Sequence, residues 1–241
     1  MEVDVLKRVP VREQDPKVRA TNFEEVCYGY NKEEAMAEAS RCLNCKNAQC
    51  MKGCPVSINI PAFVEQVKNG DFTKAYEIIS ESSALPAVCG RVCPQESQCE
   101  GKCIRGFKGD PVSIGKLERF VADTARENGI KPKTAAEKNG KKVAVIGSGP
   151  AGLSFAGDMA KQGYDVTVFE ALHEIGGVLK YGIPEFRLPN KIVDVEIDNL
   201  SKMGVKFMKD CIVGKTISVE DLEAEDFKLS LIHISEPTRR S

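Results

Sequence analysis

The chain has 241 residues, a length that suggests one or two domains, and 42% of them are hydrophobic, enough to build a core. Its formal net charge is −1, without an arginine-rich arm or a basic and aromatic stripe, so we expect no nucleic-acid partner. No apolar run approaches the roughly 20 residues that cross a bilayer, and no apolar segment opens the sequence. We therefore expect no membrane partner and a cytoplasmic location, where the ten cysteines stay reduced.

Residues 1–130 are predicted to form a helical, cysteine-rich domain. Polar caps and the helical spacing of apolar residues indicate where its helices begin and end. The predicted helices are residues 31–41, residues 61–70, a helix capped by Asp71, and residues 113–127.

Eight of the ten cysteines fall into two runs inside this domain. Thiolate sulfur is the ligand that iron–sulfur clusters require, and short C-x2-C and C-x3-C steps let neighbouring thiolates face one cluster. Eight thiolates could hold two four-iron clusters, an arrangement typical of single-electron transfer. The first run is Cys42, Cys45, Cys50 and Cys54, and the second is Cys89, Cys93, Cys99 and Cys103.

Disulfides and structural zinc are the competing interpretations of these runs. A disulfide scaffold is disfavoured because the sequence carries no secretion signal. Zinc also accepts four thiolates, but zinc ribbons usually repeat the C-x2-C step, which the second run lacks. Cys27 and Cys211, outside the runs, are expected to be ordinary thiols. The basic residues around the second run, which could offset a cluster's charge but are expected to be solvated, are Arg91, Lys102, Arg105 and Lys108.

The composition changes near residue 130. Residues 131–142 are polar, contain Pro and Gly, and lack periodicity, as in a linker. A strand, a helix and a second strand follow, as at the start of a parallel α/β sheet. The predicted elements are strands 143–146, 165–169 and 205–208 and helices 150–162 and 191–203.

A glycine-rich sequence after the first of these strands fits G-x-G-x-x-G, and the acid Glu170 ends the next strand. Because it follows a strand and opens a helix, the motif predicts a dinucleotide site where backbone amides approach a pyrophosphate. Glu170 is expected to bind the adenosine ribose hydroxyls and to disfavour a 2′-phosphate, so NADP is a poor occupant of this site. The motif residues are Gly147, Ser148, Gly149, Pro150, Ala151 and Gly152.

The stretch after Glu170 favours FAD over NAD. Residues 170–177 (EALHEIGG) resemble flavoprotein reductases, in which paired glycines approach the flavin side of the dinucleotide. His173 is expected to be a surface loop residue and not a base. Residues 181–189 (YGIPEFRLP), made rigid by two prolines, are expected near the isoalloxazine ring.

Together these motifs resemble the amino-terminal half of the NADPH-dependent glutamate synthase small (beta) subunit family. The same module occurs in the N-terminal part of dihydropyrimidine dehydrogenase and in the large subunit of flavin-bifurcating ferredoxin–NADP transhydrogenases. The resemblance runs from about Thr21 to Lys228. Besides the cysteine runs and the glycine-rich motif, it includes CGRVCP at 89–94, CEGKC at 99–103, VSIGKLERF at 112–120 and GGVLKYGIPEFRLP at 176–189.

The resemblance implies two interleaved clusters in an α-helical double [4Fe-4S] domain, followed by a Rossmann-like FAD-binding domain. One cluster would use Cys42, Cys45, Cys50 and Cys103. The other would use Cys54, Cys93 and Cys99, with a fourth ligand that in some members is not cysteine and matches Glu118 here. Cys89 would then be a bystander, and from the sequence alone Glu118 is equally an exposed helix residue. For FAD, the implied residues are the glycine-rich motif, Glu170, Gly177 and Leu179, with Val213 near the adenine.

The implied function is that of an iron–sulfur flavoprotein oxidoreductase. NADPH would reduce FAD, and two [4Fe-4S] clusters would carry electrons to a partner, the glutamate synthase large subunit or another redox subunit. The main alternative is the large subunit of an electron-bifurcating, NADH-dependent ferredoxin–NADP transhydrogenase. A non-enzymatic electron-transfer or interaction module, and structural zinc beside a vestigial nucleotide fold, also stay open.

The end of the sequence carries a separate hypothesis. Proteins of this family run about twice this length, and their second half holds the NADPH-binding domain. Residues 229–241 include LSLIHISEPTR, which is the translation of a common transposase-adapter sequence. We therefore expect the genuine sequence to end at Lys228, leaving an incomplete FAD-binding domain over residues 143–228 and an inactive chain. The alternating LSLIHIS also fits a strand that the family has near this point.

Overall fold

The computed structural model describes residues 4–131 and 137–232. The chain divides into two compact units, and each is described by itself. The cysteine unit comprises Met1–Lys133 and Pro184–Glu196, and the sheet unit comprises Thr134–Ile183 and Ile197–Ser241. The cysteine unit therefore includes a segment that comes late in the sequence, and residues 132–136 of the predicted linker lie outside the described part.

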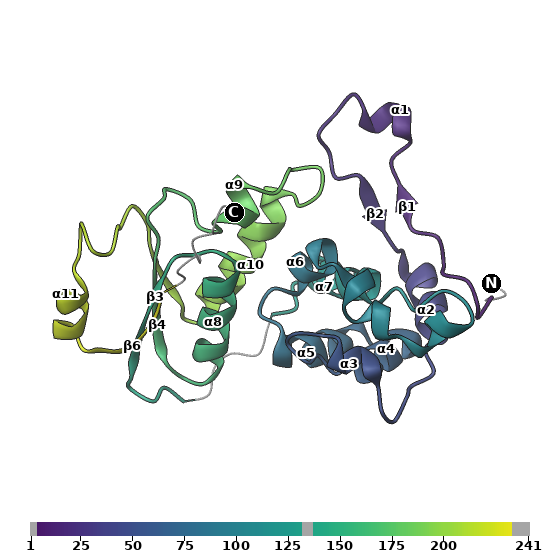
Figure 1. Ribbon diagram of the computed structural model, residues 1–241, viewed down its shortest axis with the longest axis horizontal. Helices are drawn as coiled ribbons and strands as arrows, with labels where there is room; N and C mark the ends of the chain where they lie inside the picture. Colours follow the sequence, from purple (N-terminus) through teal and green to yellow (C-terminus); the bar gives the residue numbers. More distant parts are fainter. Residues whose placement is uncertain (1–3, 132–136, 233–241) are drawn as a thin grey trace, which may run out of the picture. The chain divides into compact units, whose positions relative to one another are not determined.

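The cysteine unit is built from helices and one short hairpin, which extends away from the helices of its unit (Figure 1). The hairpin pairs β1 (Arg12–Glu13) with β2 (Cys27–Gly29) in antiparallel fashion and carries α1 (Pro16–Arg19) between them. The α-helices that follow are α2 (Lys32–Ser40), α3 (Gln49–Lys52), α4 (Ile60–Asn69), α5 (Phe72–Ser82), α6 (Pro86–Val92) and α7 (Ile114–Glu127). Short 3-10 helices lie between α6 and α7: η1 (Gln95–Ser97), η2 (Glu100–Lys102) and η3 (Ile104–Phe107).

Polar caps explain where these helices begin. Asn31 and Glu34 form a capping box at the start of α2, in which each side chain accepts a hydrogen bond from the backbone N–H of the other residue. Asp71 caps α5 by accepting from the N–H of Lys74. Gly70 ends α4 in the left-handed conformation, with φ of 80°. The helices predicted from these caps are confirmed.

The core of the cysteine unit lies between α4, α5 and α7. Each helix is amphipathic and turns an apolar face toward the others. The side chains buried there include Phe63, Val64 and Val67 of α4, Ala75 and Ile79 of α5, and Leu117 and Val121 of α7. Cys50, Cys54 and Cys103 pack against this cluster. Cysteines of both runs therefore lie on an apolar scaffold.

A buried ion pair fixes the C-terminal end of α2. The Glu38 and Arg41 side chains are fully buried, and Arg41 Nη1 lies 2.5 Å from Glu38 Oε1. The Glu38 carboxylate also accepts from the backbone N–H groups of Val9 and Ser113, each at 2.8 Å. Arg41 Nη2 donates to the carbonyl of Asp110 at 2.5 Å. The pair therefore ties the N-terminal segment and the loop before α7 to α2.

Helices α6 and α7 approach closely because α6 contains a glycine. A Cβ built on Gly90 would lie 2.5 Å from the backbone nitrogen of Arg119 and 2.7 Å from its Cα, distances that real Cβ atoms do not show. The neighbours of these two residues in sequence are Cys89 and Glu118. The glycine contact therefore brings Cys89 and Glu118 to the same helix interface.

The sheet unit contains the predicted parallel α/β fold. Its elements are β3 (Lys142–Ile146), α8 (Pro150–Lys161), β4 (Asp165–Phe169), α9 (Val178–Tyr181), β5 (Lys206–Met208), α11 (Val219–Ala224) and β6 (Phe227–Ile232). Helix α10 (Asn190–Lys202) starts in the cysteine unit and ends in this one. Helix α8 packs against β3 and β4 (Figure 1).

The strand order is β5-β4-β3-β6, and every pairing is parallel. The chain moves outward from β3 to β4 and β5, and β6 then pairs with the free side of β3. The order therefore reverses at β3, and ligands of open α/β sheets bind at the carboxyl ends of strands at such a reversal.

Strand β6 covers the start of the suspected adapter segment. Leu229 pairs with Val143, and Ile232 pairs with Ile146, so the alternation predicted for LSLIHIS continues the sheet as far as residue 232. Residues 233–241 lie outside the described residues. The adapter origin of residues 229–241 stays a prediction, which the source codons would test.

No helix within residues 4–131 and 137–232 combines the length and the apolar character that crossing a membrane requires.

We predict that Gly90→Ala destabilises the cysteine unit by about 1–3 kcal/mol, because the added methyl group overpacks the contact between α6 and α7. This cost opposes the helix propensity gained from alanine, up to about 1 kcal/mol, and exceeds it because the clash is with backbone atoms. Urea unfolding followed by circular dichroism measures the change. The control is Gly106→Ala, whose Cβ would meet Pro111 at an ordinary 3.8 Å. Equal stability of the two variants would contradict the close approach.

Candidate functional site

Four cysteines from the two runs line one cavity in the cysteine unit. The cavity has a volume of about 560 Å³, and the cysteines in its lining are Cys42, Cys45, Cys50 and Cys103. No other cysteine in the described parts of the chain belongs to that lining. This is the set that the family resemblance implies for the first cluster, and it joins the last cysteine of the second run to three of the first.

The walls of this first cavity are mostly apolar and come from α4 and the start of α7, including Ile60, Val64 and Ile114. Burial raises the pKa of Cys42, and the neighbouring thiols of Cys103 and Cys45 raise it further. Burial likewise raises the pKa of Cys50 to about 11, again with contributions from Cys103, Cys42 and Cys45. Thiolates at this site therefore need a positively charged partner.

The second implied set gathers where α6 ends and α7 begins. Cys93 follows α6, Cys99 is buried just before η2, and Cys54 follows α3. Burial raises the pKa of Cys99 to about 12, with further contributions from Glu100, Glu118 and Cys54. A hydrogen bond from Cys89 lowers the pKa of Cys93 to about 7. Glu118 and Cys54 are thus close enough to Cys99 to influence its pKa, and Cys93 is close enough to influence that of Glu118.

Glu118 is not the exposed helix residue that one interpretation of the sequence predicted. Its side chain is buried at 7% exposure, and its Oε1 has no hydrogen-bond partner within the described residues. Burial raises the pKa of this carboxyl group well above its usual value, and the negative charges of Cys93 and Glu196 raise it further. A buried carboxylate oxygen without a partner is the kind of atom that a metal ion satisfies.

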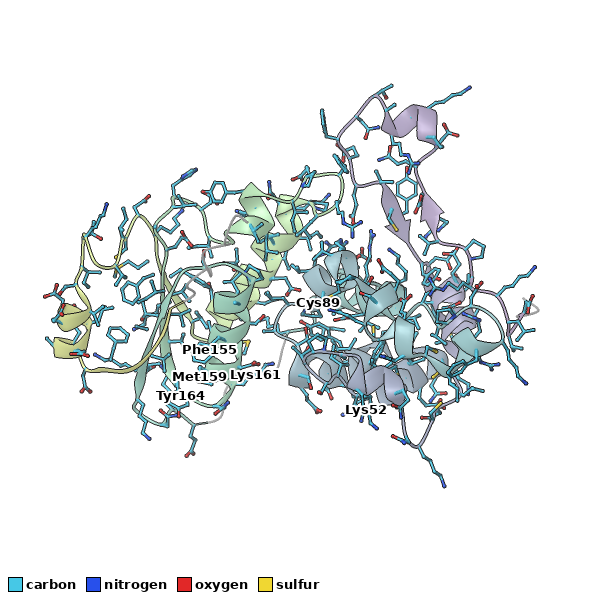
Figure 2. All side chains as sticks on the ribbon, in the orientation of Figure 1. Lys52, Cys89, Phe155, Met159, Lys161 and Tyr164 are labelled. Atoms are coloured by element: carbon cyan, nitrogen blue, oxygen red, sulfur yellow. The ribbon has the colours of Figure 1, made fainter. Side chains whose placement is uncertain are left out.

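Cys89 lies on α6 (Figure 2). Cys93, one turn later, is the C-cap of the same helix. Its hydrogen bond with Cys93, then burial, raise the pKa of Cys89 well above the usual value. The hydroxyl of Ser83 lies 4.0 Å from its sulfur and donates to it. Cys89 is therefore a close neighbour of the second set, and its status as bystander or ligand stays open.

The prediction that Arg91 is a solvated surface residue is wrong. Its side chain is only 2% exposed, with Nε 2.8 Å from Glu25 and Nη2 2.8 Å from Asp123. Arg119 pairs with the same two acids at 3.0 and 3.4 Å. Because the carboxylates come from the segment leading into β2 and from α7, this network joins the hairpin, α6 and α7.

Two arginines lie beside the first cavity: Arg41, which was not predicted to have a role, and Arg105, which was expected to be solvated but is partly buried. Arg41 directly precedes Cys42 and is fully buried. Arg105 is half-buried, lines the cavity, and donates from Nε to the Arg41 carbonyl at 2.7 Å. Adjacency of an arginine to a ligand cysteine is the signal that could have indicated Arg41. Lys102 and Lys108 are exposed, as predicted.

In the sheet unit, the glycine-rich motif forms the turn between β3 and α8. Gly149 precedes the helix and Pro150 is its first residue, followed by the exposed Ala151. A Cβ built on Gly152 would lie 2.1 Å from the carbonyl oxygen of Gly147, so only glycine permits this turn. The turn lies at the carboxyl end of β3, and the N-terminus of α8 attracts an anion there. The predicted position of the motif is confirmed.

Glu170 directly follows β4 and forms hydrogen bonds with this turn. Its carboxylate accepts from the Ser148 N–H at 2.8 Å, from the Ser148 hydroxyl at 2.5 Å, and from the Leu172 N–H at 2.9 Å. The Ser148 hydroxyl oxygen in turn accepts from the Gly176 N–H at 2.9 Å. The hydrogen bonds of Ser148 therefore connect the turn to Glu170 and Gly176. The contact between Glu170 and a ribose stays a prediction.

The other residues implied for FAD lie at different places in the sheet unit. A Cβ on Gly177 would lie 2.9 Å from the Cα of Gly149, so this glycine reaches the glycine-rich turn. Leu179 is buried on α9, and Val213 packs against the small cluster that contains Phe169. The structure thus joins Gly177 to the motif and leaves the roles of Leu179 and Val213 as predictions.

The segment expected near the flavin ring divides between the two units. Its first part contains Tyr181, whose hydroxyl lies 3.3 Å from Nδ1 of the exposed His173, a surface loop residue as predicted. Its second part belongs to the cysteine unit, where Phe186 and Arg187 line a second cavity of about 680 Å³ together with the hairpin. Proximity to a flavin stays a prediction.

Two family descriptions match the chain, in the order that the fold suggests. Residues 19–130 match dihydropyrimidine dehydrogenase domain II, 4Fe-4S cluster. Residues 145–204 match an NAD(P)-binding Rossmann-like domain.

Curated relatives cover both units. The NAD-dependent dihydropyrimidine dehydrogenase subunit PreT of Escherichia coli K12 is 43% identical over 192 residues, which is 80% of this chain and 47% of the relative. The glutamate synthase [NADPH] small chain of the same organism is 38% identical over 218 residues, 90% of this chain and 46% of the relative. The chain thus spans about half the length of these relatives. The chain is therefore similar to the amino-terminal half of the proteins in the family that includes the glutamate synthase small chain and the PreT subunit.

Proposed function

We propose that the protein is an iron–sulfur flavoprotein oxidoreductase that carries electrons from a reduced pyridine nucleotide through FAD and two [4Fe-4S] clusters to a partner subunit. When bound, these cofactors supply the redox chemistry, and the protein supplies spacing, burial and tuning. Because the chain covers about half of its relatives, the activity is proposed for the whole protein.

The observation that carries the proposal is the convergence of Cys42, Cys45, Cys50 and Cys103 on one cavity. Gathering thiols from two separate runs in an apolar pocket raises their pKa, which gives no benefit if they stay ordinary thiols. If the four thiolates bind a cationic cluster, the metal offsets the cost of burying them. This supports the first cluster.

The second cluster is proposed for Cys54, Cys93 and Cys99, completed by Glu118. The buried Oε1 without a partner supports the carboxylate as the fourth ligand. Cys89 is the alternative fourth ligand, because it shares a hydrogen bond with Cys93 and is partly buried in this interface.

Zinc and disulfides are less well supported. A single zinc ion needs all its ligands about 2.0–2.3 Å from one point, and no three metal-binding side chains in the described residues converge in that way. A four-iron cluster accepts thiolates from the corners of a larger body, as around the first cavity. All ten cysteines are free thiols.

FAD is proposed for the glycine-rich turn, with its pyrophosphate at the N-terminus of α8. The matched family is described as NAD(P)-binding, so the choice of FAD rests on the paired glycines Gly176 and Gly177, the second of which reaches Gly149. The pyridine nucleotide is NADPH in the interpretation that we favour. One relative is named as NAD-dependent and another as NADPH-dependent. The nucleotide that the full-length protein oxidises therefore indicates which of these two relatives it resembles in function.

If the protein is a glutamate synthase small subunit, its partner is the large subunit, which hydrolyses glutamine. If the protein is instead the large subunit of an electron-bifurcating transhydrogenase, its partner is a small subunit that resembles a ferredoxin reductase. The identity of the copurifying subunit therefore distinguishes the two assignments. If the full-length protein binds clusters but does not reduce a dye with NADPH, the result would support a non-enzymatic electron-transfer module.

We predict that anaerobic reconstitution of the 241-residue chain yields a brown protein with roughly eight iron atoms, as two four-iron clusters require. Cys50→Ser should lose about half of the iron, because it removes one ligand of the first set. Cys89→Ser should keep all of the iron if Glu118 is the fourth ligand of the second cluster. Iron and sulfide analysis with visible absorption measures both variants.

The pattern of loss distinguishes the assignments. A colourless, iron-free product would contradict cluster binding altogether, and about two equivalents of zinc would favour structural zinc. Loss of iron in Cys89→Ser but not in Glu118→Ala would assign the fourth ligand to Cys89.

We predict that the chain binds FAD more tightly than NAD, and that Glu170→Gln weakens FAD binding roughly tenfold or more, because hydrogen bonds to a charged group contribute about 1.5–3 kcal/mol. Glu170 both accepts from the turn and is expected to accept from the ribose. Quenching of flavin fluorescence measures the affinity. Glu174→Gln, which alters a more exposed carboxylate after the same strand, is the control. Binding of NAD but not FAD would overturn the flavin assignment.

A further inference from the structure

Three buried polar side-chain atoms in the described residues of the cysteine unit have no hydrogen-bond partner, and two of them belong to residues beside the proposed clusters. In the described residues, such side-chain atoms are Arg41 Nε, Ser80 Oγ and Glu118 Oε1. Native proteins pair nearly all such groups, so each one calls for an explanation. Glu118 belongs to the proposed second cluster. Arg41 adjoins the first cavity and has no role in the function proposed above.

The position of Arg41 is fixed from several sides. Its Nη1 contacts Glu38 Oε1 at 2.5 Å and the Pro111 carbonyl at 3.4 Å, and its Nη2 donates to the Asp110 carbonyl at 2.5 Å. Its own carbonyl accepts from Nε of Arg105. Pro111 and Arg105 both line the first cavity, so Arg41 forms a layer directly behind the cavity wall.

The unpaired Nε–H is costly in this place. A guanidinium group stays charged in proteins, and leaving one buried donor unsatisfied costs about 1–3 kcal/mol, more for a charged group. The residue after Arg41 is Cys42, which lines the cavity. A bound iron–sulfur cluster would bring thiolate and sulfide acceptors to that cavity, and hydrogen bonds to these sulfurs set the potential of a cluster.

We propose that Arg41 is a positioning residue for the first cluster, donating an N–H···S hydrogen bond from Nε and so raising the reduction potential of that cluster. The proposal rests on the proposed function, since it requires a cluster on Cys42, Cys45, Cys50 and Cys103. The reduced cluster carries one more negative charge than the oxidised cluster, so a cationic donor stabilises the reduced form more. Glu38 holds the guanidinium in place by its ion pair.

The test is a potentiometric titration followed by electron paramagnetic resonance on the reconstituted 241-residue chain. The signal of the first cluster is the one that Cys50→Ser removes. Arg41→Lys keeps the charge but loses Nε, and we expect its ratio of reduced to oxidised first cluster to fall about tenfold at a fixed potential, which is about 59 mV for one electron. Lys108→Gln, which removes an exposed charge, should change the ratio by less than about twofold, because solvent screens it.

A second measurement keeps the proposal testable if Arg41→Lys fails to fold. Pulsed electron paramagnetic resonance on the unaltered chain, grown with nitrogen-15 arginine, should show a nitrogen coupling to the reduced first cluster. The coupling should persist in Arg105→Lys, which removes the arginine that lines the cavity. An unchanged ratio in a fully loaded Arg41→Lys chain, or no coupling in the Arg105→Lys background, would overturn the proposal. A chain without any first cluster would instead refute the proposed function.

Discussion

The desolvation of cysteine thiolates is the constraint on which the cysteine unit depends. Burial is the largest cause of the raised pKa of Cys50, about 11, and of Cys99, about 12. A thiolate in such a place is unfavourable unless a positive charge lies beside it. The unit nevertheless gathers several of these thiols around the apolar helices α4 and α7. We therefore expect metal binding and folding to be coupled in this unit.

The sheet unit meets the opposite requirement, since a dinucleotide brings negative charge. The turn after β3 leaves no room for a side chain at Gly152, and the N-terminus of α8 supplies partial positive charge. Glu170 adds a negative charge beneath this turn, but three hydrogen bonds from Ser148 and Leu172 hold it there. A carboxylate with so many donors keeps the loop in one conformation before any ligand arrives.

Local patterns predicted the elements well, because caps and periodicity act within a few residues of each other. Asn31, Gly70 and Asp71 end or begin helices in the structure as they do in the sequence. Spacing could not show that Cys103 meets the first run, because that depends on the path of the chain through η2 and η3; only the resemblance implied it. The burial of Glu118 was equally out of reach. It follows from Gly90, which lets α6 cover a face of α7 that looks polar in isolation.

The exchange of ligands between the two cysteine runs has a consequence for how the protein is made. If Cys103 completes the first cluster and Cys54 serves the second, neither metal centre can close until the ribosome has released nearly the whole helical region. Iron would then be delivered to a late, already compact intermediate rather than to a short nascent peptide. Oxidative destruction of one cluster would loosen the segment between the two cysteine runs and expose the other cluster to the same damage.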